Sequence, residues 1–174
     1  MVLRGLFVGR FQPPHKGHLE IIRKILNEVD ELIIIIGSAQ YNYTLRNPFT
    51  TGERIWMLRE ALREYDIDLS RIIIVPLNDI ENNALWVRYV QTHTPPFSIV
   101  YTGNEFVAKL FKDMNVEVKM VDMIERDKYS GTRIRELMIK GSDEWKEFVP
   151  KSVVKIIEII RGVERLKIVA RTSL

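Results

Sequence analysis

The chain has 174 residues, of which 46% are apolar and 28% are charged, and its formal net charge is +3. These values are typical of one folded domain rather than of a disordered or fibrous chain. There is no cysteine, which excludes disulfides, thiolate nucleophiles and cysteine metal sites. The mild positive charge suits an anionic ligand without demanding nucleic acid.

The longest unbroken apolar run, Leu32 to Ile36, is far shorter than the roughly 20 residues that a membrane helix needs. The start of the chain carries no signal-peptide pattern. We therefore expect a cytoplasmic protein with no membrane partner. We also expect one domain over residues 1–174, in which 151–174 forms a C-terminal helical segment and arm.

Short apolar runs alternate with stretches of helical spacing along the whole chain. The runs predict strands at 2–8, 32–36, 72–75, 97–101 and 116–121. Helices are predicted at 19–26, 55–65, 84–91, 105–111, 134–139 and 153–160, and 165–170 is interpreted as a short final strand or arm. Most runs lack strict alternation, which favours strands buried on both faces. The order predicts an α/β fold: a three-layer, doubly wound parallel sheet of about five strands with helices on both faces.

An open sheet of this kind binds ligands at the carboxyl ends of its strands, so the loop Gly9 to His18 is the first expected site. His15 and His18 are three residues apart at a helix start, so both rings can lie on one side. Gly9 and Gly17 leave room for a phosphate, which the free N–H groups of a helix start also favour. The loop matches neither GxGxxG nor GxxxxGK[ST]. A lone histidine is usually structural, whereas this pair indicates phosphate handling.

Zinc ligation is the competing interpretation of the two histidines. Because cysteine is absent, the missing ligands would be carboxylates or His93, which is predicted at a helix end away from the first loop. No GxSxG sequence supports a serine hydrolase either. We therefore predict no metal-binding residues in the protein.

A second motif, Tyr129 to Arg135, opens the predicted helix at 134–139. Ser130 or Thr132 can cap this helix, and its free N–H groups with the hydroxyls can hold phosphates. Arg135 offers the fixed positive charge that a transferring phosphoryl group needs. Taken alone, the motif fits an ordinary capped helix better than a phosphate site.

The loop after the third strand carries the residues that suit an acceptor. Trp86 could stack on a flat heteroaromatic ring, and Asn83 could hydrogen-bond a carboxamide. Packing of Trp86 into the core of its helix explains that residue equally well. Arg46, after the second strand, is a candidate ligand of an acceptor phosphate.

Together these segments resemble the (H/T)xGH nucleotidylyltransferase superfamily, and the string GRFQPPHKGH looks more specifically like the archaeal-type nicotinamide mononucleotide (NMN) adenylyltransferases. The likeness extends to the Asp-Ile-x-x-Asn-x-x-Trp pattern of 79–86 and to the turn 102–104. It implies a Rossmann-like fold and transfer of AMP from ATP to NMN, giving NAD⁺ and pyrophosphate by direct in-line attack. It also implies Mg²⁺ carried by ATP, small-molecule partners, and a homo-oligomer such as a hexamer.

The residues and the resemblance together predict three sets of side chains. Catalytic roles are expected of His15, His18, Arg10, Arg46 and Arg135. ATP binding is expected of Gly9, Arg10, Phe11, His15, His18, Gly103, Asn104, Ser130, Gly131, Thr132, Arg133 and Arg135. NMN binding is expected of Ser38, Arg46, Asp79, Ile80, Asn83 and Trp86. A histidine can carry a proton near neutral pH without being permanently charged, which suits His18 as donor to the α-phosphate.

Two other functions stay open at this point. One is another adenylyl- or cytidylyltransferase of the superfamily, with phosphopantetheine, flavin mononucleotide or a polyol phosphate as acceptor; Asn83 and Trp86 argue against it. The other is a non-catalytic nucleotide-binding domain, against which the intact histidine pair argues. A nucleic-acid binder is not expected, because lysine and arginine are spread among 23 acidic residues. Nicotinic acid mononucleotide stays open as a second acceptor.

Overall fold

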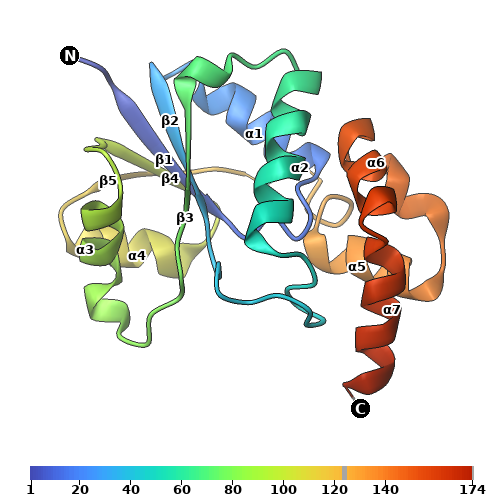
Figure 1. Ribbon diagram of the computed structural model, residues 1–174. Helices are drawn as coiled ribbons and strands as arrows, with labels where there is room; N and C mark the ends of the chain where they lie inside the picture. The colour runs from blue at the N-terminus through green and yellow to red at the C-terminus, as the bar shows by residue number, and fades with distance from the viewer. Residues whose placement is uncertain (123–124, 174) are drawn as a thin grey trace.

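A computed structural model describes residues 1–122 and 125–173 (Figure 1). It contains a parallel sheet in the order β3-β2-β1-β4-β5. The strands are β1 (Arg4–Gly9), β2 (Glu31–Ile36), β3 (Ile72–Pro76), β4 (Ile99–Thr102) and β5 (Glu117–Met120). The predicted α/β fold with five parallel strands is therefore confirmed, with strand ends shifted by one or two residues.

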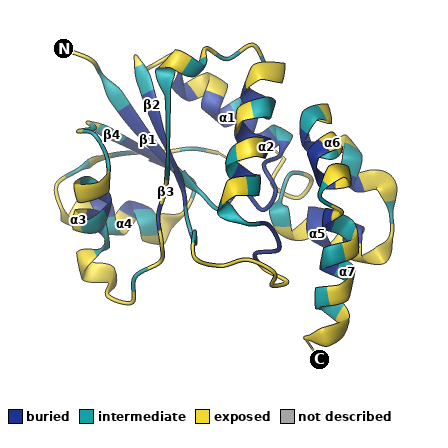
Figure 2. Cartoon of the chain, in the orientation of Figure 1, coloured by how far each residue is buried: buried dark blue, intermediate teal, exposed yellow. Residues whose placement is uncertain are grey.

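Helices cover both faces of the sheet, and β2 shows why its sequence is continuously apolar. Leu32, Ile34 and Ile36 belong to the core on one face, whereas Ile33 and Ile35 belong to the core on the other. Figure 2 shows β2 between the helical layers, and all of its residues after Glu31 are buried. The first core contains α1 (Lys16–Ile25), α2 (Thr51–Glu64) and α5 (Gly131–Lys140), and the second contains α3 (Asn83–His93) and α4 (Glu105–Asp113). Burial of both faces removes the need for polar alternation.

The C-terminal segment differs from the expectation of a strand or arm at 165–170. After the 3₁₀ turn Asp143–Glu147, the chain forms α6 (Lys151–Ile159) and then α7 (Gly162–Thr172). Val163 and Leu166 are one helical turn apart, and Leu166 is fully buried in the first core. Burial of this apolar stripe explains why a helix forms here instead of a strand. Figure 1 shows α6 and α7 beside α2, away from α3 and α4.

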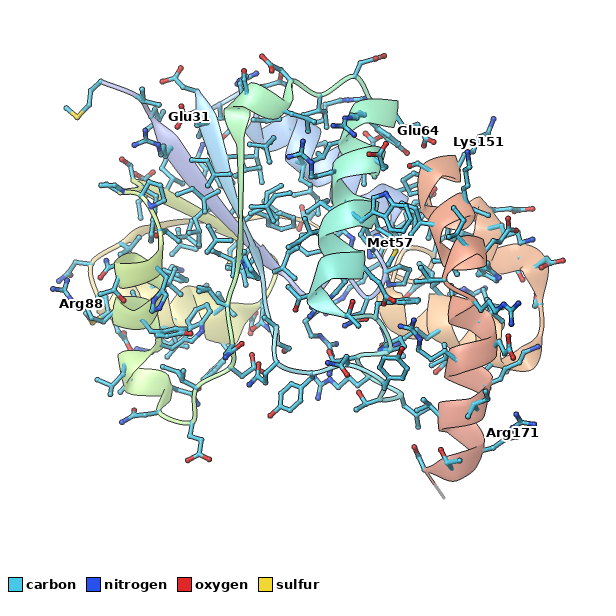
Figure 3. The ribbon with its side chains drawn as sticks, viewed as in Figure 1. Glu31, Met57, Glu64, Arg88, Lys151 and Arg171 are labelled. Atoms are coloured by element: carbon cyan, nitrogen blue, oxygen red, sulfur yellow. The ribbon has the colours of Figure 1, made fainter. Side chains whose placement is uncertain are left out.

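Helix α2 carries an acidic side chain near each end, and each one caps the start of a helix. Thr50 and Glu53 form a reciprocal capping box at its start, with N–O distances of 3.2 Å and 2.8 Å. At its other end, the Glu64 carboxylate accepts the backbone N–H groups of Lys151 and Ser152 at 3.1 Å and 2.9 Å. Glu64 therefore caps α6, and Figure 3 shows Glu64 and Lys151 at the adjacent ends of the two helices. The C-terminal helices are thereby held against α2.

The strand order reverses between β1 and β4, because β2 follows β1 on one side and β4 pairs with it on the other. The loops after these two strands consequently leave in opposite directions and open a crevice at the carboxyl edge of the sheet. In the part of the chain that the structure describes, no helix is long and apolar enough to span a bilayer.

An ion pair between α2 and α7 yields a stability prediction. Arg165 binds both carboxylate oxygens of Glu53 at 2.7 Å, and both side chains are largely buried. Replacing Arg165 by Met should lower the free energy of unfolding by about 2 kcal/mol, between the values for exposed and buried pairs. Denaturant unfolding at about pH 7 measures this. The matched control is Lys109→Met, which breaks the exposed pair with Asp113 and should cost about 0.5 kcal/mol or less.

The same pair predicts a pH dependence. Burial alone would raise the pKa of Glu53, but hydrogen bonds from Arg165 and Thr50 outweigh it and leave that pKa below its ordinary value. The contribution is therefore present above about pH 4.3, the unfolded value, and is lost as pH falls through the folded pKa. The difference in free energy of unfolding between wild type and Arg165→Met should therefore be smaller at about pH 3 than at about pH 7. An equal difference at both pH values would show that the pair does not titrate as described.

Candidate active site

Two cavities meet at the crevice between β1 and β4. The first, of about 300 Å³, is bounded by the loops after β1 and β4 and by the start of α5. The second, of about 410 Å³, is bounded by the loops after β2 and β3 and by α3 and α4. Both are lined by Val8, Arg10, Thr102 and Asn104. A ligand with two parts can therefore occupy both cavities across these shared residues.

The histidine pair builds the start of α1. His15 is the N-cap residue and its Nδ1 accepts the backbone N–H of His18 at 3.4 Å, while Nδ1 of His18 accepts the backbone N–H of His15 at 3.1 Å. The two rings stack with centroids 3.6 Å apart. Both rings line the first cavity, so they lie on one side of the helix start.

The pair is neutral in the free protein. Burial lowers the pKa of His15 to about 3, and burial together with neighbouring His15 lowers the pKa of His18 well below its ordinary value. This differs from the expectation of a histidine that is partly protonated near neutral pH. Since each Nδ1 accepts a backbone N–H, each neutral ring carries its proton on Nε2. Both rings can therefore donate one hydrogen bond to a ligand.

Two motif glycines allow the first loop to touch the segment that opens α5. A Cβ on Gly17 would lie 3.0 Å from Cβ of Tyr129 and 3.1 Å from the His15 ring. A Cβ on Gly131 would lie 2.8 Å from Nη1 of Arg135. A side chain at Gly17 would crowd Tyr129 and the His15 ring, and one at Gly131 would displace the Arg135 guanidinium from its position beside Gln12.

Arginine side chains gather where the loops meet. Arg135 is buried and donates to the backbone oxygen of Gln12 at 2.8 Å and to Oγ1 of Thr132 at 3.4 Å. Burial, with the charges of Arg10 and Arg46, lowers the pKa of Arg135 to about 10. Within the described residues, Nη1 of Arg10 is buried without a hydrogen-bond partner. This orphaned donor and the mutual repulsion indicate a site built for a polyanion.

The second cavity combines an aromatic wall with polar groups. Trp86 packs edge-on against Phe111, with centroids 5.4 Å apart, and also lines the cavity. It therefore takes part in the core and borders the site at once. Asn83 lies one turn away, and Oγ of Ser38 donates to Oδ2 of Asp79 at 2.8 Å.

The structure brings most of the predicted site residues together. The first cavity is lined by Arg10, Phe11, His15, His18, Gly103, Asn104, Ser130, Gly131, Thr132 and Arg135. The second is lined by Gly9, Ser38, Asp79, Ile80, Asn83 and Trp86, along with Arg10 and Asn104. Arg46 borders a third hollow of about 430 Å³ together with Arg10 and Arg135. Arg133 does not line these cavities: it pairs with Glu144 at 3.7 Å and lies over Phe148.

Three further residues at the site, Arg126, Gln12 and Arg54, were not among the predicted site residues. Arg126 lines the first cavity. The side-chain amide of Gln12 forms two hydrogen bonds with the backbone of Phe49, at 2.9 Å and 3.0 Å, and joins the first loop to the start of α2. Arg54 is fully buried beneath the loops after β1 and β2. Only the position of Gln12 inside the first motif could have drawn attention to it.

A divalent ion at this site would depend on its substrate. Across residues 1–122 and 125–173, no group of three or more histidines and acids could hold a metal ion. The first cavity is instead lined by arginine and histidine side chains. The residues present therefore fit a cation that arrives with phosphates and keeps water and phosphate oxygens as ligands.

Comparison with known proteins agrees with this geometry. The cytidylyltransferase-like family model matches residues 6–137. The nicotinamide-nucleotide adenylyltransferase of Caldivirga maquilingensis is 58% identical over 97% of this chain and 94% of its own length. The enzyme of the same name from Pyrococcus horikoshii is 52% identical over 95% of this chain and 88% of its own.

Solved structures share the fold. A bifunctional NMN adenylyltransferase/ADP ribose pyrophosphatase from Francisella tularensis, complexed with AMP and a Mn ion, aligns with a TM-score of 0.74 at 23% identity. The alignment covers 96% of this chain and 52% of that longer chain. With both motifs in place and relatives this similar over nearly its full length, the chain belongs to the archaeal nicotinamide-nucleotide adenylyltransferase family of the nucleotidylyltransferase superfamily.

Proposed function

We propose that the chain transfers the AMP group of ATP to NMN, giving NAD⁺ and pyrophosphate in one displacement. The observation that carries this proposal is the junction of the two cavities at Arg10. The first cavity has the donors that phosphates need, and the second has the aromatic ring and amide that suit nicotinamide. A two-part dinucleotide product matches that arrangement.

The proposed binding mode follows the two cavities. The triphosphate of ATP lies between the histidine pair at the start of α1 and the start of α5, where Ser130, Gly131 and Thr132 line the first cavity. The adenosine lies by Gly103 and Asn104 at the end of β4. These placements bring the α-phosphate next to the histidine pair.

The acceptor is held on the other side of Arg10. The nicotinamide ring stacks on Trp86, and Asn83 hydrogen-bonds its carboxamide. Arg10 and Arg46 bind the NMN phosphate, which brings its oxygen into line with the α-phosphorus.

The chemistry needs no nucleophile from the protein. An oxygen of the NMN phosphate forms the new bond to the α-phosphorus as the bond to the pyrophosphate oxygen breaks. The attacking oxygen is already anionic, so no general base is required. Nε2–H of His18 donates to an α-phosphate oxygen, with His15 beside it, and Arg10, Arg46 and Arg135 neutralise the charge that develops. Approach of the phosphate raises the pKa of both histidines and strengthens the donated bonds.

Mg²⁺ is the divalent ion that we propose to accompany ATP, supplying further charge neutralisation on the phosphates. We also propose a homo-oligomer in the cytoplasm, with a hexamer as the expected assembly. Exposed apolar side chains on α5, α6 and α7, namely Ile139, Ile159 and Ile168, support an assembly surface on the C-terminal helices.

A turnover assay tests the function. Purified protein with ATP and Mg²⁺ should release pyrophosphate and form NAD⁺ when NMN is supplied. Phosphopantetheine, flavin mononucleotide and glycerol phosphate serve as alternative acceptors, and nicotinic acid mononucleotide measures the breadth of the pyridine site. Turnover with one of the first three and none with NMN would replace this proposal by the rival superfamily activity.

Removal of the His18 ring tests its role in the transition state. His18→Ala should lower kcat by ~10²-fold, with a smaller loss of ATP affinity, because the lost bond is strongest in the transition state. Steady-state kinetics and ATP titration measure the two effects. The control is His93→Ala, since exposed His93 lies at the end of α3 and bonds locally to Tyr89. Equal kcat in both variants would remove His18 from the catalytic set.

Trp86→Ala tests the acceptor cavity. Loss of the stacking wall should raise KM for NMN by about ten-fold and leave KM for ATP nearly unchanged. Trp56→Ala removes a tryptophan on α2 that is 41% exposed and lines neither cavity, so it should change neither constant. If Trp86→Ala lowers stability without a change in KM for NMN, Trp86 is a core residue alone.

A further inference from the structure

Arg54 holds the ends of two strands with one guanidinium. It lies on the first turn of α2, and its relative exposure is 0%. Nη1 donates to the backbone oxygens of Arg10 and Gly37, both at 2.8 Å. Nη2 donates to the backbone oxygen of Ser38 at 3.2 Å and to Oγ1 of Thr51 at 3.3 Å. The fork thus joins the first residues after β1 and β2.

All four of these acceptors are neutral. Over the described residues, no carboxylate forms an ion pair with Arg54, and Asp79 is the acid whose charge acts on it. Burial, with a contribution from Arg10, lowers the pKa of Arg54 to about 10, so the side chain stays charged at neutral pH. A buried charge without a counter-charge is unfavourable unless something else compensates it. Substrate phosphates are the anions that the adjoining cavities would supply.

The residues whose carbonyls Arg54 holds also line the cavities. Arg10 lines each cavity and carries the orphaned Nη1, while Gly37 and Ser38 line the second. Ser38 has a φ of 51°, an uncommon conformation for a residue with a side chain. The hydrogen bond to its carbonyl helps to keep it there. Movement of Arg54 would therefore displace the backbone of Arg10 and, with it, the Arg10 side chain.

A purely structural arginine in the same chain provides the contrast. Arg71 also donates to three backbone oxygens, those of Leu26, Val29 and Asp30, at 2.6 to 2.8 Å. These lie before β2, at the opposite end of the sheet from both cavities. Arg71 is partly exposed, so water compensates its charge. The two arginines share a bonding pattern but differ in location and in burial.

We propose that Arg54 is a positioning residue of the transfer reaction: it fixes the main chain of Arg10 and Ser38, so that the donors of both cavities are held in place for phosphates before substrate binds. The proposal rests on the proposed function for its kinetic consequences. It acts through other residues and touches no substrate atom in the binding mode given above.

The test compares Arg54→Lys with Arg71→Lys. Lysine keeps the charge but cannot hold three carbonyls in the same plane. Both variants should melt at lower temperature than wild type. At a temperature where both are folded, Arg54→Lys should lower kcat by about ten-fold and raise KM for ATP and NMN by about five-fold, and Arg71→Lys should match wild type. Normal kinetics in a folded Arg54→Lys would overturn the proposal.

A binding measurement separates this proposal from the proposed function. Calorimetric titration with tripolyphosphate needs no turnover, and Arg54→Lys should bind it about five-fold more weakly than wild type or Arg71→Lys. If wild type lacks turnover with NMN but this difference appears, the activity is wrong and the role of Arg54 stands. Equal affinity in all three proteins would contradict that role.

A milder variant covers the case in which Arg54→Lys does not fold. Thr51→Val removes the hydroxyl that accepts from Nη2 of Arg54 and donates to the Ala39 carbonyl at 2.6 Å, while α2 and the charge remain. It should raise KM for ATP and NMN by about two- to three-fold. Unchanged KM values in Thr51→Val would then overturn the proposal.

Discussion

Positive charge crowded at the carboxyl end of β1 is the constraint around which this site is built. Burial and the charge of Arg46 lower the pKa of Arg10, and burial with the charges of Arg10 and Arg46 lowers the pKa of Arg135. Arg54 adds a fully buried charge behind them. Hydrogen bonds to backbone carbonyls stabilise the buried arginines of this cluster. Arg135 donates to the oxygen of Gln12, and Arg54 donates to the oxygens of Arg10 and Gly37. Carbonyl dipoles stabilise the charges without cancelling them. The cluster therefore keeps its attraction for phosphates while its geometry is fixed before any substrate arrives.

The histidine pair shows the same preorganisation with neutral groups. A conventional helix cap uses a serine or aspartate oxygen, whereas α1 uses two imidazole nitrogens that cap each other's backbone. This local bonding determines which nitrogen carries the proton, and burial removes the net charge. Helix capping, tautomer and orientation toward the cavity are thus consequences of one four-residue sequence, His15 to His18. The glycine within it lets Tyr129 approach, which joins this segment to the one that opens α5.

Elements whose residue pattern is local could be predicted from the sequence. The apolar run of β2 predicted a strand covered on both faces, and the helical spacing over 55–65 predicted a helix that the structure shows as part of α2. Contacts between distant segments were not predictable: Arg54 reaches back 44 residues to Arg10, and Arg135 reaches back 123 residues to Gln12. ATP binding was expected of both Arg133 and Arg135, but residues two apart on a helix face different ways: Arg135 is buried, whereas Arg133 pairs with Glu144. The final helix was missed because its apolar stripe is buried by packing against α5 and α6, and such tertiary contacts are not visible in the local sequence pattern.

The central claim is that fixed donors and charges promote a single displacement at the α-phosphorus, with no covalent bond to the protein. Stereochemistry at that phosphorus tests it most directly. ATP made chiral at the α-phosphorus by one sulfur substitution would be converted with NMN, and the configuration of the product would be determined by phosphorus NMR. One in-line attack predicts inversion. Retention would require two displacements through a covalent enzyme intermediate and would contradict the account.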